Sequence, residues 1–194
     1  MKKFLLLLLL PLLSFGQLRD SVYVKTDIYE VMYSETLEQP LWVKYQVLCT
    51  GVGASRKGMD FYKDKTIHTS DEKDYAYNIY DKGHCAPAAD FNCTREMLYK
   101  TFSYLNCILQ NERLNRVHWR LLEDYERLLA FSEGSVNVEI KIVFDKNPRR
   151  VPAGAAIPTA FYKIIKTKSK TVAFYFLNEA PKKATFVDYQ VKIK

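Results

Sequence analysis

The chain has 194 residues, of which 48% are hydrophobic and 26% charged, and its formal net charge is +7. This length and composition exclude a disordered or collagen-like chain and favour one globular domain with a sizeable core. Four cysteines are too few for a scaffold held by disulfides alone. The basic excess indicates an acidic partner, and nucleic acid, an anionic polysaccharide and a membrane surface all fit it.

Residues 1–16 have the layout of a secretory signal peptide. Two lysines precede an apolar run from Phe4 to Leu13, and a short exit follows that ends at Gly16. The run is too short to span a bilayer, which takes roughly 20 residues. We expect cleavage after Gly16, which leaves a single domain over residues 17–194 with a formal charge of +5. Such a protein is exported to the periplasm or the medium. Because no cysteine lies near the cleavage position, a lipid anchor is not indicated.

The first third of the mature chain is predicted to form strands and one long loop. Alternating hydrophobic residues predict strands over 22–33 and 41–48, joined by a turn over 34–40. The polar segment 50–74 is predicted as a loop, and its length itself points to a function. Residues 75–80 form a short, aromatic strand candidate.

The second half contains the one long helix that the sequence predicts. Leucines and other apolar residues recur at spacings of three and four over 113–130. A loop with three prolines is expected over 145–158. Strands are predicted over 137–144, 161–165 and 171–176, and more weakly over 184–194. Strands on both sides of one helix favour an α+β fold over alternating βαβ units.

The cysteines are Cys49, Cys85, Cys93 and Cys107, and none of their spacings is that of a structural zinc site. In an exported protein we expect one or two disulfides, and the sequence leaves all three pairings open. Cys85 adjoins a histidine, so a nucleophilic role for it stays an alternative. Nothing in the sequence indicates a lowered thiol pKa there.

Three histidines offer candidate chemistry, and their neighbours distinguish them. His68 lies in the polar loop without a partner pattern, and His118 lies in the predicted helix, where packing or solvent exposure is expected. His84 ends the segment Asp81-Lys82-Gly83-His84, which resembles the D-R-G-H signature of the DNA/RNA non-specific endonucleases, the ββα-metal or His-Me finger group. The following Ala86-Pro87-Ala88-Ala89 is similar to the family's continuation.

A second block supports the resemblance. Residues 101–106 and Gln110 resemble the family's S-N-x-x-P-Q segment, and residues 114–123 resemble L-N-x-x-x-W-x-x-L-E on a long helix. Residues 39–45 are similar to the family's opening strand, and residues 158–165 to its P-x-x-F-x-K-V-I strand. The resemblance covers most of the chain. It implies a ββα-metal fold, with a mostly antiparallel central sheet and a long helix that carries the metal ligand.

The family's chemistry suits the residues at these positions. Phosphodiester hydrolysis needs an activated water, stabilisation of added negative charge and help for the leaving oxygen. The resemblance implies His84 as general base and Asn115 as ligand of one Mg²⁺, with Mn²⁺ as a substitute; Mg²⁺ keeps several waters, so one amide oxygen suffices as anchor. It also implies that Glu123 organises metal-bound water. Eight residues separate Glu123 from Asn115, about 80° round an ideal helix, so both can face one site. The alternative for Glu123 is an exposed carboxylate paired with Arg127.

Further site residues follow from the same resemblance. Lys82 stands where the family usually has arginine, so it keeps the charge without the planar two-pronged phosphate contact. Arg56 is matched to an arginine that supports the scissile phosphate, and Leu109 replaces a proline. The predicted substrate-binding residues are Asp81, Asn106, Gln110, Arg116 and Lys163, with Arg113 and Arg120 as further groove candidates. The alternatives are that Asn106 satisfies a turn and that the basic residues are merely solvated.

Together these features predict an exported, Mg²⁺-dependent endonuclease that cuts DNA and RNA with little sequence preference. Non-specificity follows if contacts are made to phosphates rather than base edges, and the resemblance implies 5′-phosphate ends. The alternative is a catalytically silent nucleic-acid-binding protein of the same fold, and a third reading is a basic domain that binds anionic polysaccharide. The chain ends at Lys194, before the family's I-E-x-x-T-G segment, so we expect a shortened C-terminal edge.

Overall fold

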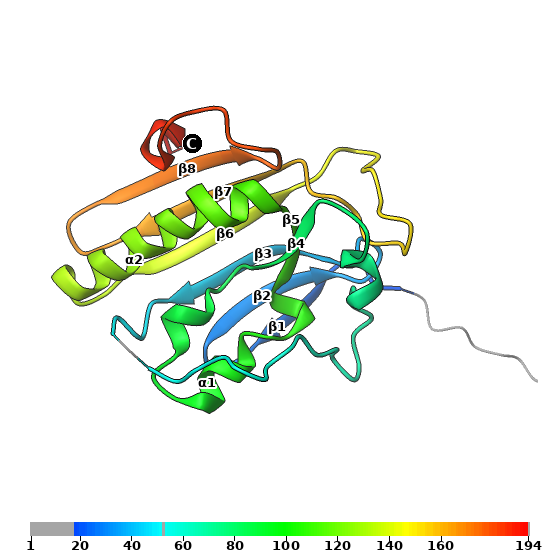
Figure 1. Cartoon of the computed structure of the whole chain (residues 1–194), viewed down its shortest axis with the longest axis horizontal. Helices are drawn as coiled ribbons and strands as arrows, with labels where there is room; N and C mark the ends of the chain where they lie inside the picture. Colours follow the sequence, from blue (N-terminus) through cyan, green and yellow to red (C-terminus); the bar gives the residue numbers. More distant parts are fainter. Residues whose placement is uncertain (1–17, 52, 194) are drawn as a thin grey trace, which may run out of the picture.

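The computed structural model describes residues 18–51 and 53–193, and the predicted signal peptide lies outside them. Its main element is a seven-stranded sheet in which all neighbours are antiparallel (Figure 1). In sheet order the strands are β1 (Val22–Lys25), β2 (Tyr29–Ser34), β3 (Gln39–Gln46), β6 (Asn137–Val143), β7 (Ala160–Lys166), β8 (Thr171–Leu177) and β9 (Gln190–Val191). The predicted α+β class with an antiparallel central sheet is confirmed.

A second, two-stranded sheet pairs β4 (Tyr80–His84) with β5 (Cys107–Asn111). The chain leaves β5 through the π-helical segment η4 (Leu114–Trp119) and continues into α2 (Arg120–Glu133). The remaining helical pieces are α1 (Arg95–Lys100) and the 3₁₀ turns η1 (Glu72–Tyr75), η2 (Ala88–Phe91), η3 (Tyr104–Asn106) and η5 (Phe186–Tyr189). In Figure 1 the small sheet, α1 and α2 lie on the same side of the large sheet. Within the described residues, no helix is long and apolar enough to cross a membrane.

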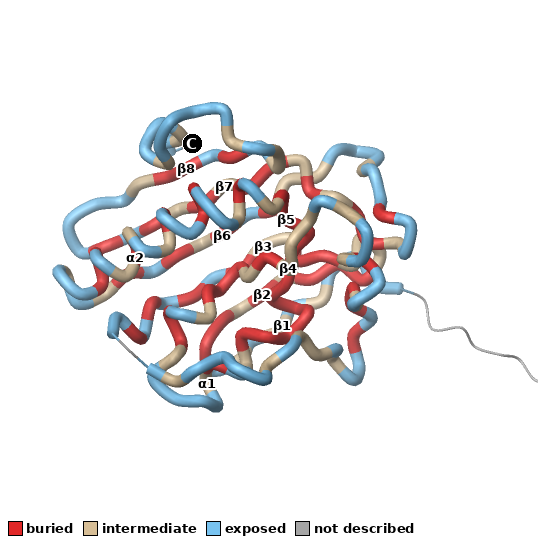
Figure 2. The backbone as a smooth tube through the Cα atoms, viewed as in Figure 1, coloured by how far each residue is buried: buried red, intermediate tan, exposed pale blue. Residues whose placement is uncertain are grey.

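The core lies between the large sheet and these covering elements (Figure 2). Alternate residues of β3 and β6, such as Val43 and Ile140, are fully buried because they point toward this layer. Leu122 and Leu129 of α2 and Trp119 of η4 fill the space opposite. Helix α2 is amphipathic and packs its apolar side on the sheet, so one face of the sheet is buried and the other is left to solvent.

Several predicted elements differ from the structure. The strand expected over 22–33 is a hairpin, because the Thr26 hydroxyl accepts the backbone N–H groups of Ile28 and Tyr29 and closes a turn. The strand expected over 75–80 is wrong: β4 begins only at Tyr80, after the 3₁₀ turn η1. Strand β5 and helix α1 were not predicted, whereas the long helix is confirmed, with a π-helical start. The C-terminal segment holds a 3₁₀ turn and a two-residue strand.

Candidate active site

Strand β4 points its residues toward two different environments. Lys82 and His84 line a cavity of about 880 Å³, whereas Gly83 between them is buried against β5. A Cβ on residue 83 would lie 2.5 Å from Oε1 of Gln110 and 2.8 Å from its Cβ. The glycine is therefore required by close approach of a neighbouring side chain.

The cavity collects residues from segments that are distant in the sequence. Its charged and polar lining includes Arg56 of the long loop, Lys82 and His84 of β4, Asn115 and Arg116 of η4, and Arg120, Glu123 and Arg127 of α2. All the predicted catalytic and metal-binding residues thus share one cavity. The predicted common facing of Asn115 and Glu123 is confirmed, and Arg113 does not line the cavity.

His84 packs against two aromatic rings that also contact each other, with 5.3 Å between the centroids of Phe61 and Phe102. Its imidazole centroid lies 4.7 Å from that of Phe61 and 4.9 Å from that of Phe102. Burial, and to a smaller extent the charge of Arg56, lowers the pKa of His84 to about 3. Its Nε2 atom is buried and has no partner among the described residues. The ring is therefore neutral near pH 7 and free to accept a proton.

The side chain of Asn115 is oriented by Asp81. Nδ2 of Asn115 donates to Oδ2 of Asp81 at 2.9 Å, which leaves the amide oxygen Oδ1 for another partner. The guanidinium of Arg116 donates to both oxygens of the same carboxylate, at 3.0 and 2.7 Å. Asp81 was predicted to bind substrate. In the structure this carboxylate positions Asn115 and Arg116, and binding of substrate by Asp81 stays a prediction.

Lys82 is held at the cavity wall by a partner that the sequence did not indicate. Its ammonium lies 3.0 Å from Oδ1 of Asp60 and over the rings of Phe61 and Tyr104, at 5.8 and 5.7 Å from the centroids. Although partial burial opposes it, the bond to Asp60 raises the pKa of Lys82. Lys82 therefore brings a fixed positive charge next to His84.

Glu123 lines the cavity, and the pKa of its carboxyl is raised. Burial, followed by the charges of Glu126 and Asp90, outweighs the opposing cations and raises its pKa to about 8. The alternative pairing with Arg127 is not seen. Arg127 instead binds Asp90, at 2.6 Å, and Asp124. Glu123 is thus left free to face the cavity.

Three predicted substrate-binding residues are buried and cannot contact substrate. Asn106 has no exposed surface and bonds to backbone only: Oδ1 accepts from Ala86, and Nδ2 donates to Ala86 and Thr101. Its alternative role, that of satisfying a turn, is the observed one. Gln110 is equally buried and packs on Gly83. Both residues shape the backbone around His84 rather than the groove.

Lys163 is the third predicted substrate-binding residue that is buried. It points into the core from β7 with no exposed surface, and its ammonium lies 2.6 Å from Oε1 of the equally buried Glu126. The other oxygen of Glu126 accepts the hydroxyl of Tyr45 at 2.7 Å. The ammonium also lies 4.4 Å from the centroid of the Trp119 ring. Lys163 therefore joins the sheet to η4 and α2 behind the cavity.

The cysteines and the other two histidines have structural roles. Cys49 and Cys93 form a disulfide, whereas Cys85 and Cys107 are free and buried. Burial raises the pKa of the Cys85 thiol well above its ordinary value, which disfavours the nucleophile alternative. The ring of His118 packs on that of Tyr189, and its Nε2 bonds to the backbone oxygen of Lys183, so the predicted packing role is the observed one. His68 lies outside the cavity.

Sequence reasoning missed the side chains that surround the base. Phe61 and Asp60 come from the long loop, and Phe102 follows α1; none belongs to a periodic pattern. The only available signal was the excessive length of the loop over 50–74, which does line the cavity through Arg56, Lys57 and Met59.

Comparisons with known proteins identify the relatives of this chain. The family model of the DNA/RNA non-specific endonucleases matches residues 14–194. A nuclease of Nostoc sp. is 29% identical over 153 residues, covering 75% of this chain and 54% of that protein. Mitochondrial endonuclease G of Bos taurus is 28% identical over 155 residues, covering 71% and 51%.

A crystal structure of the EndoG/EndoGI complex shares the fold, with a TM-score of 0.77 at 23% identity over 88% of this chain and 80% of that one. The chain spans about half the length of the curated relatives it matches. With a matching fold, both sequence blocks and a family model that covers nearly the whole chain, this protein belongs to the DNA/RNA non-specific endonuclease family.

Proposed function

We propose that the protein is an exported, metal-dependent endonuclease that hydrolyses phosphodiester bonds of DNA and RNA without sequence preference. The observation that carries the proposal is that Arg56, Lys82, His84, Asn115 and Glu123 line one cavity, although they come from three separate segments. A neutral imidazole, fixed cations and an oriented amide oxygen are what this hydrolysis requires.

His84 acts as the general base in this proposal. Its lowered pKa keeps the imidazole neutral at working pH, which a proton acceptor requires, although the same shift weakens it as a base. We assign the acceptor role to Nδ1, because Nε2 is buried. Contacts with Phe61 and Phe102 fix the orientation of the ring. Lys82 and Arg56 offer positive charge where the phosphate gains negative charge.

The residues present fit a magnesium ion, with Mn²⁺ as a substitute. Within residues 18–51 and 53–193, no three histidine, cysteine, aspartate or glutamate side chains are placed to hold a metal together. An ion here therefore takes most of its ligands from water, as Mg²⁺ commonly does. Asn115 would hold it through Oδ1, which Asp81 leaves free, and Glu123 would lie beside it, where the charge of the ion would favour the ionised form of this carboxyl. When bound, the ion neutralises phosphate charge and stabilises the leaving oxygen.

Separate observations support the proposed lack of sequence preference and the proposed export. The charged lining of the cavity consists largely of arginine and lysine, which recognise phosphates and carry no base information. The Cys49–Cys93 disulfide supports an oxidising compartment, in agreement with the signal peptide predicted over residues 1–16. Polysaccharide binding needs none of the oriented groups around His84.

The test is cleavage of plasmid DNA and of RNA with Mg²⁺ or with EDTA. We expect the wild-type protein to cut both in Mg²⁺ and neither in EDTA. His84→Ala and Asn115→Ala should lower the rate by at least about 100-fold, because each removes a group that acts in the transition state. The matched control is His68→Ala, since His68 lies outside the cavity and should leave the rate unchanged.

Each other outcome rejects part of the proposal. A wild-type protein that binds but never cuts favours the catalytically silent alternative. Cutting by His84→Ala at the wild-type rate rejects the assigned base, and full activity in EDTA rejects the metal.

A further inference from the structure

The outer face of the large sheet, opposite α1 and α2, carries one row of side chains in direct register. The strand pairings place these residues side by side across six neighbouring strands: Tyr23, Met32, Trp42, Lys141, Tyr162 and Tyr175, hereafter the aromatic row. With strands about 4.8 Å apart, the row is about 24 Å long. Four of its six members are aromatic.

The aromatic row is accessible at both ends. Tyr23 is 51% exposed and Tyr175 is 37% exposed, and the rings of Tyr23 and Trp42 lie 6.0 Å apart between centroids. Among the described residues, both α-helices lie on the opposite side of the sheet (Figure 1). The hydroxyl of Tyr162 is buried without a partner in the described part of the chain. Aromatic surface on an open sheet is typical of a binding face.

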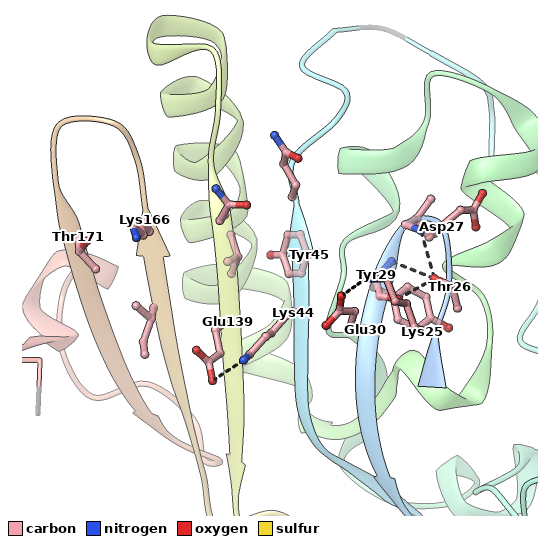
Figure 3. Close-up of a pocket in the computed structure, with 15 residues that line it drawn as sticks. Lys25, Thr26, Asp27, Tyr29, Glu30, Lys44, Tyr45, Glu139, Lys166 and Thr171 are labelled. Atoms are coloured by element: carbon pink, nitrogen blue, oxygen red, sulfur yellow. Dashed lines mark hydrogen bonds and ion pairs between the residues drawn. The ribbon is translucent and has the colours of Figure 1, made fainter. Parts of the chain in front are cut away.

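Beside the aromatic row lies a charged row of two lysines and two glutamates. Lys25, Glu30, Lys44 and Glu139 follow one another in register and line a hollow of about 480 Å³ (Figure 3). Glu30 is 2.8 Å from Lys25, and Glu139 is 3.8 Å from Lys44 and 3.9 Å from Lys141.

Asp27 at the rim of the hollow is paired with Lys100, at 2.7 Å, and Lys166 has no acidic partner among the described residues. Taken together, the two rows and Lys166 contain four lysines and two glutamates. The face therefore keeps a positive excess once its ion pairs are formed.

A narrow strip of this kind suits one extended polymer better than a second copy of the chain. A stable dimer buries about 800 Å² on each partner, which here would cover the charged row and desolvate its ion pairs. Single-stranded nucleic acid instead stacks its bases on aromatic rings and leaves its phosphates to nearby lysines.

We propose that this face binds single-stranded nucleic acid, with bases on Tyr23, Trp42 and Tyr175 and the backbone along Lys44 and Lys166. No bond is broken there. The face goes beyond the proposed function and gives long single strands a second contact, which raises their effective affinity for the enzyme.

Intrinsic fluorescence offers a direct test, because the chain has two tryptophans and Trp119 is fully buried. The His84→Ala protein in EDTA is titrated with oligothymidylate, and with an abasic strand of equal length and charge. We expect saturable quenching of Trp42 by oligothymidylate and none by the abasic strand. Tyr23→Ala/Tyr175→Ala should weaken oligothymidylate binding by about tenfold. Phe131→Ala, which removes a 77% exposed aromatic of α2, should not weaken it.

The outcomes that overturn the proposal are distinct from failure of the nuclease. Unchanged affinity in the double variant, absence of quenching, or equal quenching by a sulfated polysaccharide each rejects a nucleic-acid face. A dimer in sedimentation that the double variant dissociates assigns the face to a second copy instead. If His84→Ala still cuts plasmid, the proposed base fails, while the quenching result stands on its own.

Discussion

Strand β7 treats its lysines in opposite ways on its two faces. Lys163 points into the core, has no exposed surface and pairs with Glu126, whereas Lys166, three residues on, is exposed on the outer face. Strand β4 also divides its residues between two environments: Lys82 faces the cavity, and Gly83 faces Gln110. Residue type alone does not decide the role of a polar side chain in this fold. The decisive property is the face of the strand on which it lies.

The largest effect expected from this contrast concerns the two lysines of β7. Lys163→Ala leaves Glu126 as a buried, uncompensated charge, so the free energy of unfolding should fall by about 3–5 kcal/mol. Lys166→Ala removes an exposed side chain and should change it by less than about 0.5 kcal/mol. Urea denaturation of both variants measures the difference. Equal losses would contradict the contrast between the faces.

A smaller effect is expected at Gly83. In Gly83→Ala the new methyl group meets Gln110, including its Cβ, which cannot move away without shifting the strand. We expect a loss of about 1–3 kcal/mol and reduced cleavage, since His84 is the next residue. Gly51→Ala is the control, because no described atom lies within 4 Å of its added methyl group. Thermal unfolding compares the two, and a neutral Gly83→Ala would show that Gln110 does not fix this position.

The smallest effect tests an ion pair that is intermediate between buried and exposed. Bonds from the Arg19 guanidinium, and from the backbone N–H groups of His68 and Arg19, lower the pKa of Glu35 from 4.5 to about 2. A lowered carboxyl pKa stabilises the fold above pH 4.5, and this stabilisation is lost as the pH falls toward 2. Glu35→Gln should therefore cost about 1 kcal/mol at pH 7.

The difference between Glu35→Gln and wild type should shrink below pH 4.5 and be mostly lost at pH 2, where about half of the wild-type carboxyls are protonated. Denaturation at a series of pH values follows it. A difference that is independent of pH would mean that the packing of Glu35, and not its charge, stabilises this end of β2.

The sequence was most informative where a pattern has a geometric consequence. Spacing along a helix placed Asn115 and Glu123 toward one site, and alternation predicted most strands of the large sheet. It failed for Asn106, Gln110 and Lys163, because a polar residue in a family block looks the same whether it contacts substrate or satisfies the core. Strand β5 escaped prediction because all five of its residues are buried, so it shows no alternation.

The π-helical start of the long helix allows the length of this segment to vary without loss of the site. A π-helical turn holds its hydrogen bonds across five residues instead of four, so it accommodates one residue more than the α-helix around it. Because the turn absorbs that residue, the residues before and after it keep the relative directions of a helix one residue shorter. Deleting one residue between Asn115 and Trp119 would convert the turn to α-helix and leave Asn115 and Glu123 about 20° apart round an ideal helix, both toward the cavity. Homologues that lack one residue here are therefore expected to keep the site, although the spacing of their motif differs.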